Sequence, residues 1–199
     1  MITLHKYEGK NVDLLKEQCL NELEDAYMVT KELESGLFKG KKYQLEAITK
    51  EEIISSIKSF INELSKNMNL EINSEIRFEE NNINILLVSD NNNILIGKDG
   101  KTLNAIQLIL RQSFKELNQF DLRIIVDVSN YKAKKIKNLE YEVKKICKEV
   151  LKTKVEVKLD PMNSYERRKV HSVVAEFEGL QSISYGETPN RYTVIKIKD

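Results

Sequence analysis

Two short motifs contain the residues whose types and spacing could do chemistry. The first is Gly97-Lys98-Asp99-Gly100, which Lys101 follows directly. Glycine permits positive φ angles and lets a phosphodiester approach the backbone without a Cβ in the way. The amides that open the next helix favour anions, and Lys98 and Lys101 add positive charge, whereas Asp99 opposes it. The motif predicts a clamp on the phosphates of a nucleic-acid strand, although two glycines at this spacing also occur in plain turns.

The second motif places Arg167 and His171 four residues apart, so both lie on one face of a predicted helix. Arg168 and Lys169 broaden its positive charge. Arginine offers a planar fork for phosphate oxygens, and histidine adds a donor whose charge depends on pH. The spacing alone favours phosphate binding and a structural role equally, because a helical histidine is often bonded internally and Arg167 could pair with a nearby carboxylate.

The sequence carries no catalytic constellation. General acid–base and nucleophilic schemes need partner groups, and the only other histidine, His5, lies in a separate segment. Neither a Ser-His-Asp order nor a P-loop is present. Cys19 and Cys147 have no second cysteine or histidine at metal-ligand spacing. We therefore predict a non-enzymatic protein without a metal or cofactor, whose cysteines are reduced and serve as small hydrophobic residues.

Composition narrows the class of protein further. Of the 199 residues, 41% are hydrophobic and 32% are charged, which suits small solvated domains. The net charge is +1, but residues 129–199 hold 16 basic and 10 acidic side chains, a local charge of +6. An anionic partner is therefore expected to be attracted most strongly to the last third of the chain. We expect a soluble, cytoplasmic protein without an integral membrane segment, because no long apolar run or signal-peptide core is present.

Residues 1–49 alternate between strand and helix patterns. Strands are expected over residues 2–7, 26–33 and 42–48. A helix capped by Asn11 or Asp13 follows the first strand. A turn that carries Gly36 and Gly40 joins the last two strands. A piece of this size would be only marginally stable alone.

Residues 50–128 show the order helix, strand, strand, glycine turn, helix, strand. Thr49 and Glu52 form the capping-box signature of the first helix. The elements that follow are strands over 70–78 and 83–89, a helix over 102–117 and a strand over 122–128. This order is typical of a KH domain of the bacterial type II arrangement, whose glycine turn clamps a few nucleotides of a single strand. The expected groove residues are Ile94, Ile96 and Leu103.

Residues 129–199 open with a long helix. Its expected inward stripe is Ile136, Leu139, Val143, Ile146 and Val150. The predicted elements are helices over 131–151 and 164–177, a strand over 155–159 and two final strands. Tyr165 is expected to pack beneath the second helix rather than to stack on a base. The whole chain is thus predicted to be α+β, with three small modules over 1–49, 50–128 and 129–199, the last a three-stranded sheet with two helices.

The segments resemble the bacterial Jag family, SpoIIIJ-associated proteins that are also called KhpB or EloR. Members join an N-terminal Jag domain, a KH domain and a domain named for its Arg-three-residues-His motif. The most specific match runs from Leu159 to Arg168 and on to His171; segment 94–103 and Val126-Asp127-Val128 before Tyr131 add to it. In the N-terminal part, Ser35-Gly36-Leu37-Phe38 is similar to the family, but Lys39 interrupts its usual Gly-Leu-Phe-Gly run. The long charged linker that many members carry before the KH domain is absent.

The resemblance implies a regulator or chaperone of single-stranded RNA, with single-stranded DNA as the other candidate ligand. The RNA-binding residues would be Gly97, Lys98, Asp99, Gly100, Lys101, Arg167, Arg168, Lys169 and His171. The implied partners are a small single-KH protein or a second copy, and membrane-insertion or envelope-synthesis machinery, with a role in cell elongation and division. The alternative is a protein-interaction adaptor that dimerises through the KH face and docks an envelope or membrane-insertion partner through the Jag domain.

Overall fold

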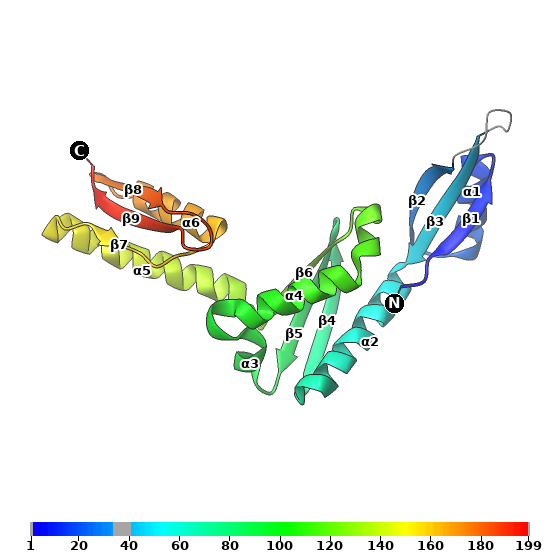
Figure 1. Cartoon of the computed structure of the whole chain (residues 1–199), viewed down its shortest axis with the longest axis horizontal. Helices are drawn as coiled ribbons and strands as arrows, with labels where there is room; N and C mark the ends of the chain where they lie inside the picture. The colour runs from blue at the N-terminus through cyan, green and yellow to red at the C-terminus, as the bar shows by residue number, and fades with distance from the viewer. Residues whose placement is uncertain (1, 34–40, 199) are drawn as a thin grey trace. The chain divides into compact units, whose positions relative to one another are not determined.

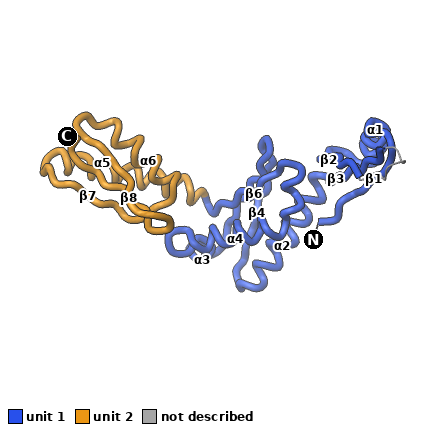
Figure 2. The backbone as a smooth tube through the Cα atoms, turned by 45° about the horizontal axis from the view of Figure 1, so that its top comes forward, with its two compact units in different colours: residues 1–129 blue, residues 130–199 orange. Residues whose placement is uncertain are grey.

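A computed structural model describes residues 2–33 and 41–198 of the chain. The chain divides into two compact units, residues 1–129 and 130–199, which Figure 2 draws in different colours. Each unit is described by itself. Both combine helices with small sheets, so the predicted α+β class is confirmed. The three module boundaries stay predictions, because the first unit includes both 1–49 and 50–128.

The chain begins with a three-stranded antiparallel sheet. Its elements are β1 (His5–Gly9), α1 (Val12–Glu22), β2 (Ala26–Leu33) and β3 (Lys42–Thr49), with the strand order β1-β3-β2. The side chain of Asn11 accepts from the amides of Asp13 and Leu14, so Asn11 is the cap of α1. Apolar side chains of α1 pack on the sheet around Cys19 and Leu45, both fully buried. The expected turn with Gly36 and Gly40, and the Ser35–Lys39 match, lie outside the described residues.

Strand β3 leads directly into α2 (Lys50–Met68) through the predicted capping box. Thr49 Oγ1 accepts from the amide of Glu52, and the Glu52 carboxylate accepts from the amide of Thr49. The elements that follow are β4 (Ile72–Glu79), β5 (Asn82–Ser89), α3 (Asn92–Ile96), the 3₁₀ turn η1 (Lys98–Gly100), α4 (Lys101–Ser113), the 3₁₀ helix η2 (Lys115–Phe120) and β6 (Arg123–Val128). The predicted order is therefore present.

These strands form a sheet with the order β4-β5-β6, in which β5 and β6 run parallel. Figure 1 shows α2 and α4 along this sheet, and the two helices contact β4 and β6 respectively. The helix predicted over 102–117 is wrong at its end, because α4 stops at Ser113. Phe114 takes a non-helical conformation with its side chain buried, edge to face with Phe60 at 5.9 Å.

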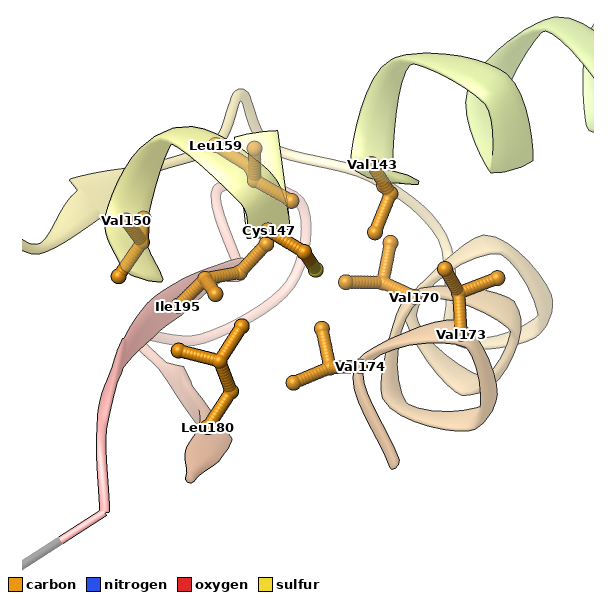
Figure 3. Packing of buried hydrophobic residues seen from close by; sticks show 9 residues of the cluster. All are labelled: Val143, Cys147, Val150, Leu159, Val170, Val173, Val174, Leu180 and Ile195. Carbon is orange, nitrogen blue, oxygen red and sulfur yellow. The ribbon is translucent and has the colours of Figure 1, made fainter. Parts of the chain in front are cut away.

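The second unit contains α5 (Tyr131–Thr153), β7 (Val157–Lys158), α6 (Ser164–Ala175), β8 (Leu180–Tyr185) and β9 (Tyr192–Ile197). The antiparallel sheet has the order β7-β9-β8. Figure 3 shows how its core forms: Val143 and Cys147 of α5 meet Val170 and Val174 of α6 and Ile195 of β9. Both helices thus lie against the same face of the sheet.

Three expectations for this unit need correction. Strand 155–159 shrinks to two paired residues, and the helix predicted to end at residue 177 ends at Ala175. Cys147 is fully buried in the inward stripe of α5, whereas Ile136 is only half-buried. After β7 the chain stays beside β9, because Leu159 donates to the Thr193 carbonyl and Met162 donates to the Arg191 carbonyl, while Pro161 between them has no N–H to donate.

The described residues were also compared with the requirements for crossing a membrane and for binding a metal ion. Among the described helices, none has the length and apolar composition that crossing a lipid bilayer requires. Within residues 2–33 and 41–198, His, Cys, Asp and Glu side chains form no cluster that could hold a metal ion. Cys19 and Cys147 are both buried free thiols, and burial raises their pKa.

Candidate nucleic-acid interface

The glycine turn is built around a backbone conformation that only glycine adopts readily. Gly97 has φ 69° and ψ −179° where α3 ends. A Cβ placed there would lie 2.1 Å from Oγ1 of Thr102 and 3.0 Å from its backbone nitrogen. Thr102 therefore packs into the space that the missing side chain leaves. The absence of a Cβ at Gly97 is thus a structural requirement of the turn.

The rest of the turn presents charge and backbone amides. Asp99 and Gly100 both have positive φ angles, 57° and 84°, so the chain bends sharply before α4. Gly100 is the N-cap of α4 and has no side chain to cap it, and the amide of Lys101 donates to the Lys98 carbonyl, so the amides that follow in the first turn receive no cap from Gly100. Such amides are suited to an anion.

Lys98 and Lys101 are exposed on either side of this bend. In the described part of the chain neither lysine forms an ion pair. Two ammonium groups beside the N-terminal end of α4 raise the local potential at the turn, and the carboxylate of Asp99 between them lowers it. The structure thus brings the five predicted turn residues together at one exposed corner of the first unit.

The expected apolar groove beside the turn is only partly correct. Ile94 is 46% exposed and Ile96 is half-buried, so both can reach a ligand. Leu103 is 1% exposed and belongs to the core, so its assignment to the groove was wrong. The helical spacing that identifies Leu103 as apolar does not distinguish a core position from a groove position.

The Arg-His motif lies on α6, which a second capping box begins. Asn163 Oδ1 accepts from the amide of Glu166 at 3.0 Å, and Glu166 Oε2 accepts from the amide of Asn163 at 3.0 Å. Glu166 is 7% exposed, and its Oε1 lies 2.7 Å from Nζ of Lys135 on α5. Figure 3 shows Val170, Val173 and Val174 reaching from the same helix into the core. These contacts fix the rotation of α6 and hence the faces on which Arg167 and His171 lie.

His171 is bonded inside the unit through both ring nitrogens. Nδ1 lies 2.6 Å from the hydroxyl of Ser182, and Nε2 lies 2.9 Å from the hydroxyl of Ser184. The Ser184 hydroxyl is in turn 3.2 Å from Oγ1 of the buried Thr193. Burial, and then the charge of Arg167, lower the pKa of His171 below its usual 6.5. The ring is therefore neutral at neutral pH, with one nitrogen donating and the other accepting.

Arg167 has the opposite character. Its side chain is half-buried, and its Nε–H is fully buried without a hydrogen-bond partner among the described residues. A buried donor without a partner costs roughly 1–3 kcal/mol, and more when the group is charged. Buried native groups of this kind usually have a ligand or water as partner. A phosphate oxygen is the natural acceptor for an arginine fork.

The two neighbouring cations contribute unequally. Arg168 is exposed, whereas Lys169 lies 3.8 Å from Oε1 of Glu140 and is partly neutralised by it. Tyr165 is 55% exposed, and Lys169 Nζ lies 5.8 Å from its ring centroid. The expectation that Tyr165 packs beneath the helix is therefore wrong. The predicted residues do share α6, with Arg167 offering the open donor and His171 joined to β8.

Sequence reasoning missed the two serines that hold His171. Ser182 and Ser184 alternate along β8 on the side that faces the helices, because Leu180 on the same side is 7% exposed in the core. Hydroxyl side chains at spacing two on a core-facing strand side were the available signal. Nothing in the sequence alone pairs them with a histidine more than ten residues earlier.

Comparison with known proteins places both motifs in named domains. The family model described as the KH domain of KhpA/KhpB matches residues 55–127, which include the glycine turn. The family model described as the R-3-H domain matches residues 137–196, which include Arg167 and His171. The two matched segments lie in different units of the chain.

The curated relatives carry one name. A Clostridium symbiosum protein called "RNA-binding protein KhpB" is 34% identical over 132 residues, which cover 66% of this chain and 60% of that protein. The Bacillus subtilis protein of that name is 26% identical over 200 residues, 96% of each chain. The Streptococcus pneumoniae one is 24% identical over 145 residues, 73% of this chain and 44% of that protein. The chain thus spans less than two thirds of two of these three relatives. The chain carries a KH domain and an R-3-H domain, and it is similar along its length to the KhpB proteins of the Jag family.

Proposed function

We propose that the chain binds single-stranded RNA and holds it without chemical change. The observation that carries this proposal is the glycine turn. It places the N-terminal end of helix α4 beside two exposed lysines, with the exposed Asp99 between them. A phosphodiester strand matches that arrangement in charge and in its need for close backbone approach. The match to a KH domain and the name of the relatives, RNA-binding protein KhpB, support RNA as the ligand.

The R-3-H domain would supply further contacts to the phosphates of the RNA. The half-buried guanidinium of Arg167 would pair with a phosphate oxygen, and exposed Arg168 would add charge beside it. Lys169 would assist once a phosphate competes with Glu140. His171 belongs to this site, and its bonds to the two serines support a role in holding α6 and Arg167 in position. Single-stranded DNA shares the phosphate chemistry, so a competition assay distinguishes the two ligands.

The test replaces both turn lysines by aspartate in the full chain. Lys98→Asp with Lys101→Asp should weaken retention of a labelled single-stranded RNA without changing the thermal midpoint. The matched control is Lys58→Asp with Lys115→Asp, two exposed lysines of the same unit that the turn does not contain. Equal binding by both double variants would contradict the clamp. Loss of RNA binding by both double variants would show that RNA binding depends on the overall positive charge and not on the glycine turn.

A second function is favoured by one observation on the KH domain. Leu108 and Ile109 of α4 are 58% and 49% exposed, which is unusual for two adjacent large apolar residues. They favour a protein-interaction adaptor in which this face binds a small single-KH protein or a second copy. Salt separates the two functions, because phosphate binding falls steeply as salt rises and an apolar interface does not.

The wider role belongs to the same proposal. Resemblance to the Jag family supports action in the cytoplasm, as an RNA chaperone or post-transcriptional regulator of cell elongation, division and envelope synthesis. It also supports an envelope or membrane-insertion partner for the N-terminal sheet. Crosslinking the protein to RNA in cells and sequencing the bound RNA tests the first part. Loss of those crosslinks in the Lys98→Asp, Lys101→Asp variant would tie them to the KH domain.

A further inference from the structure

The sheet of the second unit has a face that its helices do not cover. Leu180 and Ile195 point towards α5 and α6, so the residues that alternate with them point away. Tyr185 of β8 and Tyr192 of β9 are directly paired in register on that outer face. In Figure 1 these strands lie side by side near the C-terminus. The outer face of this sheet thus presents a cross-strand pair of tyrosines.

The pair has the geometry of a stacking surface with a cation beside it. The ring centroids of Tyr185 and Tyr192 lie 6.1 Å apart with 34° between the ring planes. Lys158 of β7 places Nζ 4.1 Å from the centroid of Tyr192. Tyr192 is half-buried, whereas Tyr185 is 45% exposed. The more open ring is therefore that of Tyr185, and Tyr192 lies between it and Lys158, because β9 is the middle strand of the sheet.

We propose that Tyr185 is a platform on which an unpaired base of the bound strand stacks, while Lys158 meets an adjacent phosphate. The proposal rests on the proposed function and adds a contact on a different face from the Arg-His motif. Ser184 points inward to His171, so Tyr185, the next residue, points to the opposite face. Base–aromatic stacking combined with a neighbouring cation is how sequence-tolerant single-strand binders work.

The charges around the platform make stacking its main contribution. Glu156 and Asp160 lie two residues on either side of Lys158 and are both exposed. This surface is therefore not strongly basic, and simple attraction of a polyanion would be weak. A planar, uncharged group next to a phosphate fits it better than a phosphate alone. A nucleotide in a single strand offers both.

The test compares two exposed tyrosines of the second unit, Tyr185 and Tyr141. Tyr185→Leu in the full chain should weaken binding of a 12-nucleotide single-stranded RNA by about 5- to 150-fold. Tyr141→Leu is the control, because Tyr141 is 62% exposed with Lys145 Nζ 4.5 Å from its ring centroid. That variant should change affinity less than about twofold. Tyr185→Trp should restore binding, because indole stacks at least as well as phenol.

The absence of tryptophan from the chain provides a direct readout of stacking. The emission of the Tyr185→Trp variant should be quenched as RNA is added, and that of a Tyr141→Trp variant should not. If wild type binds RNA but Tyr185→Leu binds equally and the Tyr185→Trp emission stays constant, the platform is overturned and the proposed function stands. If wild type binds no RNA, both are overturned. If Tyr185→Leu alters only sedimentation, the face is a self-association surface and the platform is overturned.

Discussion

Nδ1 of His171 lies 2.6 Å from the hydroxyl of Ser182, so the histidine of the Arg-His motif joins helix α6 to strand β8. The second ring nitrogen makes a similar bond to Ser184. Arg167 and His171 therefore have different roles. Arg167 has a buried donor without a partner among the described residues, and the bonds of His171 help to fix the position of the helix that carries both.

This bonding predicts how the second unit responds to acid. Because burial lowers the pKa of His171 in the folded chain, the unfolded chain binds its proton more readily. Stability is then full above the unfolded pKa of about 6.5 and falls as the pH drops through it. Between about pH 7.5 and pH 5.5, wild type should lose more thermal stability than His171→Gln. Equal losses in the two proteins would contradict the burial of the ring beside Arg167.

The unpartnered donor of Arg167 predicts a separation of stability from binding. Arg167→Met retains much of the aliphatic stem and removes the buried Nε–H. The variant should unfold at the same or a higher temperature than wild type, because a buried unpaired donor costs roughly 1–3 kcal/mol. Its affinity for single-stranded RNA should fall. Loss of stability with unchanged RNA affinity would assign Arg167 to the fold.

Gly97 should tolerate no side chain. Gly97→Ala combines a positive φ with a contact of 2.1 Å to Thr102, so it should destabilise the first unit by more than the roughly 1–2 kcal/mol of backbone strain alone. Gly179→Ala is the matched control, since Gly179 has φ +81° but a Cβ there would lie 3.9 Å from the side chain of Leu151. Hydrogen exchange of the amides in each unit measures both losses. A smaller loss at Gly97 than at Gly179 would contradict the packing of Thr102.

Two variants of Glu166 separate the contribution of its capping-box bond from that of its ion pair with Lys135. Glu166→Ala removes the acceptor for the Asn163 amide and the ion pair with Lys135, so we expect a loss of about 1–3 kcal/mol in the free energy of unfolding. Glu166→Gln keeps an acceptor for the capping box and should lose less. Urea unfolding monitored through the second unit measures the difference. If both variants lose the same free energy of unfolding, the ion pair with Lys135, and not the capping box, accounts for the contribution of Glu166.

Local signals in the sequence predicted much of the fold. Thr49 with Glu52 marks the start of α2, and apolar alternation gives β2 and β3 nearly to the residue. The end of α4 escaped prediction because an apolar residue at helical spacing, Leu117, is buried from a 3₁₀ helix just as it would be from an α-helix. The helix ends just before Phe114, whose ring packs against Phe60. This contact joins segments that are distant in the sequence, so local patterns could not predict it.

The candidate site was predictable in composition but not in roles. Glycines, lysines and the Arg-His spacing identify the two motifs without a structure. Spacing could not show that His171 is bonded to β8 while Arg167 is left open, because that difference depends on Ser182 and Ser184. Tyr185 also escaped notice, since its exposure follows from the register with Tyr192.

The most direct test of the central claim measures how RNA affinity depends on salt. For a single strand, the slope of log affinity against log salt is about −0.7 for each phosphate that a cation neutralises. Replacing Lys98 and Lys101 by alanine should therefore make the slope less negative by about 1.4. Replacing Lys58 and Lys115 by alanine should leave it unchanged. A slope that is the same in wild type and in the Lys98→Ala, Lys101→Ala variant would contradict the phosphate grip at the glycine turn.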